Sequence, residues 1–247
     1  MIAHFKGSLP FIMPDQMAQI EKLLSEDYGI STLQVLENAG LNLAVLARDK
    51  FLGNEPNGKK VVVVTGPGSN GGGAMVAARR LRNWGASVSL LLTEPNGKFE
   101  KETVEQFSIC QKQNIPIVET IGKANLVIDG IKGYEFKGRL SNYEIKIVGE
   151  INDSGIPVLA FEMPTGLDLS TGSPGEKTIK AEATLGLAIP KYGHFRQKAA
   201  KFIGELFLSD ICVPVEIYKS LKIPTENLAR AFGESPVVKI NKIVVFS

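Results

Sequence analysis

The feature that most constrains the fold is an apolar run of strand length, residues 61–65, which leads directly into the glycine-rich segment 66–73. A continuous apolar run suits a strand that is buried on both faces, as the strands of parallel sheets are. Apolar residues at helical spacing, from Ala74 to Trp84, come next. This order of strand, glycine-rich turn and helix predicts an α/β protein whose sheet is mostly parallel.

The same alternation continues along the chain, and no internal repeat, low-complexity tract or linker divides it. With 247 residues, the chain has the length of one large α/β domain. We therefore expect a single domain over residues 1–247 with a doubly wound sheet. Strands are expected at 61–65, 88–92, 126–129, 158–162, 181–189 and 204–211, and helices at 14–28, 31–51, 74–84, 98–113 and 142–154.

Histidine and cysteine are scarce, because the chain contains only His4, His194, Cys110 and Cys212. No CxxC or HxxxH spacing exists, so the sequence argues against a zinc site. A nucleophile paired with histidine would have to use His194, because His4 is expected in a mobile N-terminus. Acid–base chemistry therefore falls to carboxylates, lysines or tyrosines.

Net charge and cysteine content indicate the cellular compartment and the classes of partner to expect. The formal net charge of +2 gives no reason to expect a nucleic-acid partner. The cysteines do not form a disulfide framework, which favours a reducing compartment. Residues 1–13 lack the features of a signal peptide, and the longest apolar runs are far shorter than the roughly 20 residues of a membrane helix. We expect a cytoplasmic protein with no membrane partner.

The glycine-rich segment contains Gly66-Pro67-Gly68-Ser69-Asn70-Gly71, a match to the G-x-G-x-x-G pattern of phosphate-binding turns. Its place before a helix gives the match physical meaning, because free N–H groups at a helix start bind anions. Two details depart from an ordinary dinucleotide site. Pro67 has no N–H to donate, and the glycines continue to Gly73, which predicts a longer and wider loop. A tight turn without a ligand is the alternative interpretation.

Acidic residues end two further predicted strands, at Asp129 and at Glu162. Ligands of open α/β sheets bind beyond the carboxyl ends of the strands, so both acids should meet the glycine-rich segment at one sheet edge. The alternatives are a turn cap for Asp129 and a surface salt bridge for Glu162. Three polar segments at the same edge favour a binding site.

Several short motifs follow one another in a fixed order over residues 14–218. They are Glu37-Asn38-Ala39-Gly40, the segments 66–73 and 75–84, Asp129 with the loop 133–138, Met163-Pro164-Thr165-Gly166-Leu167-Asp168, the segment 181–184, Pro190-Lys191-Tyr192-Gly193-His194 and Gly204-Glu205-Leu206-Phe207. By these motifs the chain resembles the YjeF N-terminal domain family, whose best-known members are NAD(P)H-hydrate epimerases. The tail, residues 221–247, lies beyond the resemblance and receives no role.

The resemblance implies a Rossmann-like three-layer α/β/α sandwich with a mostly parallel central sheet, often as a homodimer. It implies an isomerase that interconverts the R and S epimers of hydrated NADH or NADPH, so that a dehydratase can repair one of them. At 247 residues, we expect that dehydratase on a separate chain. The family also binds a potassium ion, which here would be held by Asn70, Asp129 and Thr165. Oxygen ligands of this kind suit a group I cation.

The resemblance also assigns the substrate site. Glu162 would face the reacting ring as general acid and base, and Lys137 would assist it or bind phosphate. Two loops would wrap the substrate. Together with Glu162, the binding residues would be Ser69, Asn70, Gly71, Gly72, Gly73, Gly133, Tyr134, Glu135, Phe136, Lys137, Gly138 and Arg139.

Some positions differ from the family pattern. Gly73 stands where the family loop has Asp, and Glu162 stands where the family strand end has Asp. Glu for Asp moves the carboxylate by about one methylene, and a shift of roughly 1 Å can cost about a hundredfold in rate. Thr165 for Ser keeps the hydroxyl group. These changes leave a second hypothesis open, a catalytically impaired module of this family that binds a nucleotide or a protein partner.

Overall fold

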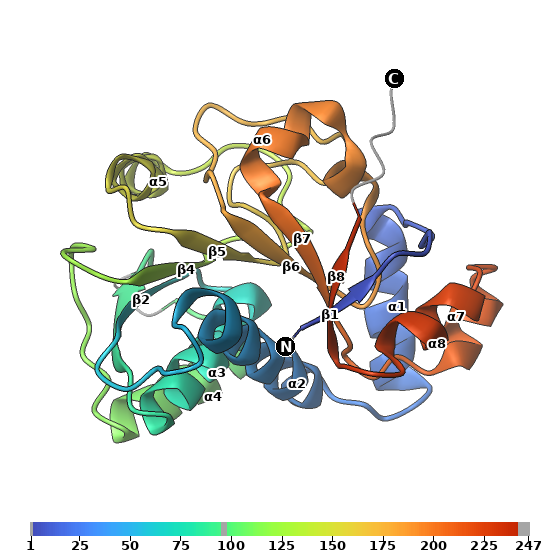
Figure 1. Cartoon of the computed structure of the whole chain (residues 1–247), viewed down its shortest axis with the longest axis horizontal. Helices are drawn as coiled ribbons and strands as arrows, with labels where there is room; N and C mark the ends of the chain where they lie inside the picture. The colour runs from blue at the N-terminus through green and yellow to red at the C-terminus, as the bar shows by residue number, and fades with distance from the viewer. Residues whose placement is uncertain (1, 95–97, 242–247) are drawn as a thin grey trace.

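A computed structural model describes residues 2–94 and 98–241 of the chain, and its core is one sheet between layers of helices (Figure 1). Within the described residues the strand order is β1-β8-β7-β6-β5-β4-β2-β3, and only the β7–β8 pair is antiparallel. The strands are β1 (Ala3–Phe5), β2 (Lys60–Thr65), β3 (Ser87–Leu92), β4 (Leu126–Gly130), β5 (Val158–Phe161), β6 (Ala183–Leu187), β7 (Glu205–Ser209) and β8 (Val237–Ile240).

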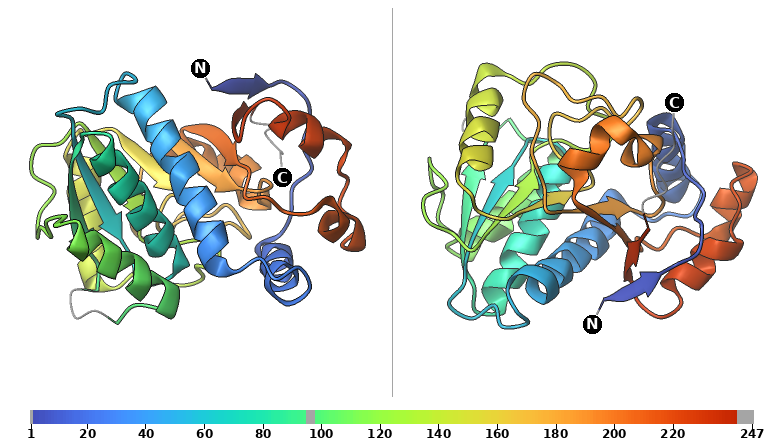
Figure 2. Two further views of the ribbon diagram at one scale, coloured as in Figure 1. Left: turned by 90° about the horizontal axis from the view of Figure 1, so that it is seen from below. Right: turned by 45° about the horizontal axis from the view of Figure 1, so that its top comes forward.

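Helices cover both faces of this sheet, as Figure 2 shows. The helices α2, α3 and α4 lie on one face, and α5 and α6 lie on the other. The helices α1, α7 and α8 gather at the end of the sheet near β8. The bounds are α1 (Pro14–Glu26), α2 (Thr32–Leu46), α3 (Ser69–Asn83), α4 (Lys101–Lys112), α5 (Asn142–Asp153), α6 (Ala200–Ile203), α7 (Val215–Ser220) and α8 (Glu226–Phe232).

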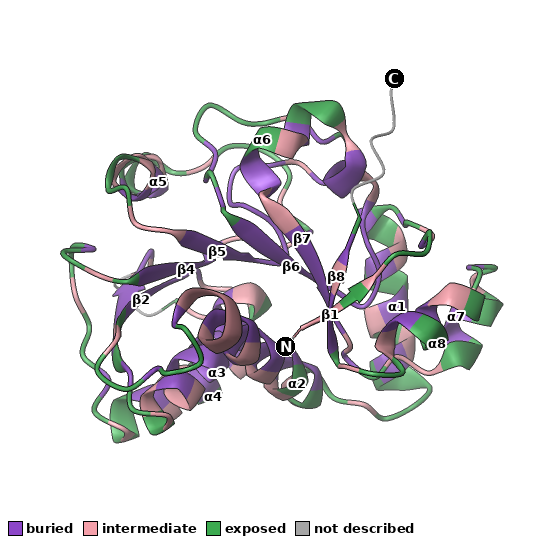
Figure 3. Ribbon diagram, viewed as in Figure 1, coloured by how far each residue is buried: buried purple, intermediate pink, exposed green. Residues whose placement is uncertain are grey.

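The strand β2, between β4 and the edge strand β3, is buried on both faces, as its apolar run predicts (Figure 3). Val61 and Val63 belong to the core on the side of α2, α3 and α4, whereas Val62 and Val64 belong to the core on the side of α5. Alternate side chains of one strand thus feed two separate cores. The expected three-layer α/β/α sandwich with a mostly parallel sheet is confirmed.

The expected wide glycine loop is wrong. The helix α3 begins at Ser69, so that residues 69–73 form its first turns and only 66–68 remain as the connection. The amide of Gly72 already donates to the carbonyl of Gly68 over 3.2 Å. Glycines here let the helix start pack closely on the sheet, which is the role of the last glycine in such turns. The start of α3 still follows the carboxyl end of β2 after a short connection.

The two ends of the chain complete the sheet. The tail, which the sequence left without a role, contributes α8 and the strand β8, and β8 pairs with β1. His4, expected in a mobile segment, lies in β1, and its Nε2 is 2.9 Å from Oδ1 of Asn241. No helix in residues 2–94 and 98–241 is long and apolar enough to cross a bilayer.

Candidate active site

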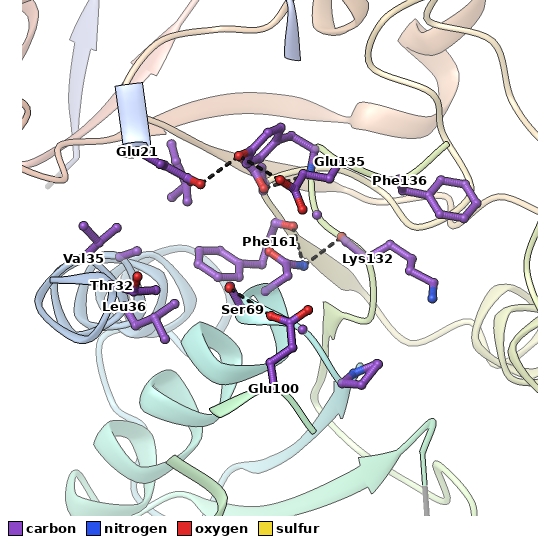
Figure 4. Close-up of a pocket in the computed structure, with 18 of the residues that line it drawn as sticks. Glu21, Thr32, Val35, Leu36, Ser69, Glu100, Lys132, Glu135, Phe136 and Phe161 are labelled. Atoms are coloured by element: carbon purple, nitrogen blue, oxygen red, sulfur yellow. Dashed lines mark hydrogen bonds between the residues drawn. The ribbon is translucent and has the colours of Figure 1, made fainter. Parts of the chain in front are cut away.

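A cavity of about 410 Å³ lies at the carboxyl ends of the central strands (Figure 4). This volume is within the range of small-molecule sites. Its walls come from α1, α2, the start of α3, the segment after β4 and the end of β5. Of the predicted site residues, those that line it are Ser69, Asn70, Gly133, Tyr134, Glu135, Phe136, Lys137 and Glu162.

The remaining predicted binding residues do not line this cavity. Gly71, Gly72 and Gly73 are buried inside the first turns of α3. Gly138 and Arg139 instead line a second hollow beyond Phe136, which contributes to both. The structure therefore divides the predicted substrate loop after Lys137.

Glu162 is buried, and the surface salt bridge considered from the sequence is not what the structure shows. Its side chain is 4% exposed, and Oε1 lies 3.2 Å from Nζ of Lys191, which is fully buried. The backbone N–H of Tyr134 donates to Oε2 over 2.9 Å. An added Cβ at Gly133 would lie 2.9 Å from Oε2, so glycine there lets the loop approach the carboxylate. The acid is thus fixed at the cavity wall by an ion pair and one amide.

The backbone of Glu162 is held in a left-handed conformation with φ of 65°. This conformation costs a non-glycine residue about 1–2 kcal/mol, so the surroundings must impose it. The N–H of Glu162 donates to the carbonyl of Leu185 over 2.7 Å. Nδ1 of His194 accepts from the N–H of Lys191, so the ring donates from Nε2 to the carbonyl of Glu162 over 2.9 Å.

This arrangement shows what His194, the histidine left available for a nucleophile pair, does instead. The ring is fully buried, does not line the cavity and bonds the backbone on both sides of the Glu162–Lys191 pair. His194 positions the acid rather than activating a nucleophile. Lys191 lies in the motif Pro190-Lys191-Tyr192-Gly193-His194 but was assigned no role, because no local spacing indicates that it reaches Glu162.

Glu21 is a cavity residue that sequence reasoning missed. It lies on α1 beside the buried stripe Met17, Ile20 and Leu24, and Oε2 accepts a hydrogen bond from the Tyr134 hydroxyl over 2.7 Å. Burial, reinforced by the nearby charge of Glu162, raises the pKa of Glu21 to about 7. The available signal was an acid at the border of the apolar face of an amphipathic helix.

Lys137 lies at the cavity rim and not inside. Its side chain is 58% exposed, and its Nζ is 3.0 Å from Oδ1 of Asp15, which is also exposed. An exposed ammonium has an ordinary solvent environment and suits a phosphate better than an enclosed proton transfer.

Asn70 and Thr165 bond to the backbone of Lys132, and Thr165 links this backbone to Asp129. The side-chain amide of Asn70 donates to the Lys132 carbonyl over 2.8 Å, and the Lys132 N–H donates to Oγ1 of Thr165 over 3.2 Å. Thr165 in turn donates to Asp129 from both its N–H and its hydroxyl. Asp129 is fully buried, and burial raises its pKa to about 6. Sequence reasoning placed these three residues together, and the structure brings them together.

One atom of this cluster has no hydrogen bond. Oδ1 of Asn70 is buried without a partner in the described part of the chain. A buried acceptor left in this way costs free energy unless a ligand satisfies it. An oxygen-rich cluster with one unsatisfied acceptor fits a hard monovalent cation. No three His, Cys, Asp or Glu side chains gather elsewhere among residues 2–94 and 98–241 as a metal site would need.

Gly73 faces the ring of Phe161. An added Cβ at Gly73 would lie 2.5 Å from Cε1 and 2.9 Å from Cζ of Phe161. The ring also lines the cavity, and Figure 4 shows it between Leu36 and Lys132. The space that an aspartate would need at position 73 is therefore occupied by an aromatic side chain.

Comparison with known proteins supports the resemblance. The model of the family described as YjeF-related protein N-terminus matches residues 32–193. The NAD(P)H-hydrate epimerase of Dehalogenimonas lykanthroporepellens is 33% identical over 82% of this chain and 82% of that protein. The NAD(P)H-hydrate epimerase of Rhodopirellula baltica is 30% identical over 87% and 89%.

Two further matches differ in extent and in what they show. The Bifunctional NAD(P)H-hydrate repair enzyme Nnr of Moorella thermoacetica is 29% identical over 82% of this chain but only 40% of its own length. The crystal structure of yeast ynu0 matches with a TM-score of 0.71 and 22% identity, over 86% of this chain and 93% of that one, and it shows the same fold. By sequence and by fold, the chain belongs to the family of YjeF-related protein N-termini.

Proposed function

We propose that this protein is an NAD(P)H-hydrate epimerase, an isomerase that interconverts the R and S epimers of hydrated NADH and NADPH. Relatives with this name match most of the chain. The observation that carries the proposal is Glu162, a buried carboxylate held at the wall of a cavity at the carboxyl edge of the sheet. It occupies the position where the sequence analysis expected the reacting acid.

Epimerisation requires the ring C–O bond of the hydrate to break and form again on the other face. The lone pair of the ring nitrogen can expel the hydroxyl group, provided that an acid protonates the leaving oxygen. This step leaves a cationic iminium ring and a water molecule. A carboxylate at the cavity wall, such as Glu162, stabilises that positive charge as it develops. Addition of the water to the opposite face then gives the other epimer.

The remaining cavity residues bind the substrate in this proposal. The start of α3, with Ser69 and Asn70, presents N–H groups of a helix N-terminus to a phosphate. The exposed ammonium of Lys137 at the rim adds a positive charge. The loop from Gly133 to Phe136 closes the opposite wall. Lys137 is therefore assigned to binding rather than to catalysis.

Asn70, Asp129 and Thr165 hold a potassium ion in this proposal, with Oδ1 of Asn70 as the free ligand atom. The ion would supply positive charge beside the substrate and fix the ends of β4 and β5. Its charge would also favour the ionised form of Asp129.

Potassium should stabilise the fold. At a concentration about tenfold above its Kd, a ligand adds about 1.4 kcal/mol, which raises Tm by roughly 3–6 °C for a chain of this size. We expect this rise in potassium chloride relative to choline chloride at equal ionic strength, measured by thermal denaturation. The Asn70→Ala variant should show no difference between the two salts. An equal rise in the variant would contradict the assigned ligands.

The proposal extends to partners and location. The family relative named as a bifunctional repair enzyme is more than twice the length that this chain covers. A dehydratase acting on the same substrate, on a separate chain, is its functional partner here. We also propose a homodimer, and a cytoplasmic location because Cys110 and Cys212 are both free thiols.

The direct test uses the purified chain and an equilibrated mixture of both epimers. A dehydratase specific for one epimer is added, and loss of the second epimer is followed by chromatography. We expect the second epimer to disappear faster with the chain present. The Glu162→Gln variant should be slower by about a hundredfold or more, as for loss of a charge-stabilising group. A rate equal to that without the chain would reject the epimerase.

One observation favours the second hypothesis, an impaired module that binds a nucleotide without turning it over. The place of the family aspartate is filled by the ring of Phe161. In that case NADP should still bind, which isothermal calorimetry would show, while the epimer assay would give no acceleration. Turnover by the unmodified chain would eliminate this hypothesis.

A further inference from the structure

Glu21 reaches the cavity from a helix that the sequence analysis did not connect with the site. Its side chain lines the cavity, and Figure 4 shows it extending from α1 toward Glu135 on the loop after β4. The helix α1 lies at the end of the sheet, so this wall is closed by an element remote from Glu162 in sequence. Glu21 therefore joins Glu100, Glu135 and Glu162 among the carboxyl groups that line the cavity in the described part of the chain.

The charges around Glu21 are unbalanced. The groups that face it are Tyr134, Glu135, Glu162 and Lys191. Only Lys191 is positive, and it is already paired with Glu162 at 3.2 Å. The phenol of Tyr134 donates to Glu21, with Glu135 3.4 Å from the same hydroxyl. Glu21 is therefore a mostly buried acid without a cation of its own.

Such an environment favours the protonated carboxyl group. Burial and the charge of Glu162 disfavour ionisation of Glu21, and together they raise its pKa to about 7. Glu162 differs, because an ammonium group and an amide N–H hold its carboxylate. Two carboxyl groups in different environments can thus carry different protonation states in one site.

Tyr134 joins the two acids structurally. Its hydroxyl bonds to Glu21, its backbone N–H bonds to Glu162, and its ring lies 5.7 Å from Nζ of Lys191. One residue thereby fixes both acids relative to each other. The hydroxyl occupies Oε2 of Glu21, which leaves Oε1 available to carry a proton.

We propose that Glu21 is the proton donor and acceptor of the epimerisation, whereas Glu162, held by its pairing with Lys191, stabilises the cationic ring. The Glu21 carboxyl group gives its proton to the hydroxyl oxygen as the C–O bond breaks, and the ring nitrogen lone pair forms the C=N bond. Water then adds to the other face, the C=N electrons return to nitrogen, and Glu21 takes the proton back. No other reactant is consumed. This role rests on the proposed epimerase function.

The test compares Glu21→Gln with Glu26→Gln, a matched control on the same helix whose side chain is 62% exposed. We expect kcat of Glu21→Gln to fall about 10²–10⁴-fold with KM changed by less than about threefold, as for loss of a general acid. Glu26→Gln should match the unmodified chain. Glu21→Asp, which keeps the proton but withdraws it by one methylene, should recover part of the rate.

The pH profile separates a chemical role from a packing role. The unmodified rate should fall as pH rises above about 7, where Glu21 loses its proton, and the residual rate of Glu21→Gln should lack this limb. A variant impaired only in packing would keep the same limb at a lower rate.

A stability measurement tests the protonation state without substrate. The folded pKa of Glu21 lies above its ordinary value of 4.5, so the folded state binds the proton more tightly than the unfolded state. The stability that protonated Glu21 contributes to the unmodified chain is therefore lost as pH rises from about 4.5 through about 7. Because glutamine cannot ionise, the Tm of Glu21→Gln minus that of the unmodified chain should increase over this range. If this difference in Tm stays constant over the range, Glu21 does not hold a proton in the folded state, and the proposal is wrong.

The outcomes are distinguishable. Turnover in the unmodified chain and in Glu26→Gln, together with its loss in Glu21→Gln, supports the donor role. Turnover retained in Glu21→Gln rejects the donor role but keeps the epimerase. An unmodified chain without turnover rejects the epimerase, and the donor role with it.

Discussion

Replacing Lys191 with methionine is expected to lower the free energy of unfolding by about 3–5 kcal/mol, because the variant leaves the carboxylate of Glu162 buried and unpaired. The two side chains are 0% and 4% exposed, so water cannot replace the lost ammonium. Nζ of Lys191 also donates to the carbonyl of Leu187 over 2.9 Å. For a chain of this size the Tm should fall by roughly 6–20 °C in thermal denaturation.

The controls separate the ion pair from the loss of a lysine. Lys22→Met removes an exposed lysine paired with Glu26 on α1 and should change stability by less than about 0.5 kcal/mol. Adding Glu162→Gln to Lys191→Met removes both charges and should restore most of the lost stability. A Tm unchanged by Lys191→Met would show that the pair contributes nothing.

The prediction of the fold succeeded where local patterns are sufficient. The run 61–65 and the acids after two later strands predicted parallel strands, and β2, β4 and β5 lie side by side within the sheet. Parallel strands place their carboxyl ends at one edge, which is why Asp129 and Glu162 were expected to meet the glycine-rich segment. The family resemblance added the expectation that Asn70 and Thr165 lie beside Asp129. The helix expected from residue 31 also begins there, because Ser31 is the N-cap of α2.

The residues that were missed act over long sequence distances. Glu21 reaches the site because α1 closes one end of the sheet, 113 residues away from its partner Tyr134. Lys191 contacts Glu162 across neighbouring strand ends. The strand β8 pairs with β1 across most of the chain. Sequence spacing cannot indicate such contacts, because they depend on which elements pack together and not on a local period.

Of the two positions that differ from the family pattern, Gly73 and Glu162, Gly73 is explained by a residue that packs against it, Phe161. Read alone, Gly73 is a lost carboxylate, and restoring aspartate would seem to repair the site. The structure shows instead that the ring of Phe161 lies where that side chain would go, 2.5 Å from an added Cβ. The ring is 1% exposed and packs beside Leu36. In this chain the ring of Phe161 therefore occupies the space that the aspartate side chain of the family pattern would need at position 73.

Gly73→Asp is therefore expected to destabilise the chain by at least about 3 kcal/mol, from overpacking against Phe161 and from an unpaired buried carboxylate. Gly73→Ala measures the steric part alone, about 1–3 kcal/mol, although alanine in a helix is otherwise favoured over glycine by about 1 kcal/mol. Urea denaturation of each variant gives these values.

The sign of the Gly73→Ala effect in the Phe161→Ala background shows whether Gly73 and Phe161 are coupled. Phe161→Ala removes the ring and by itself should cost about 3–5 kcal/mol. In that background Gly73→Ala should become neutral or stabilising, because the added methyl group then fills vacated space and the helix preference of alanine is expressed. If Gly73→Ala destabilises equally in both backgrounds, the two residues are not coupled. Coupling would show that position 73 and the ring of Phe161 share one packed space in this chain, which leaves no room there for the aspartate of the family pattern.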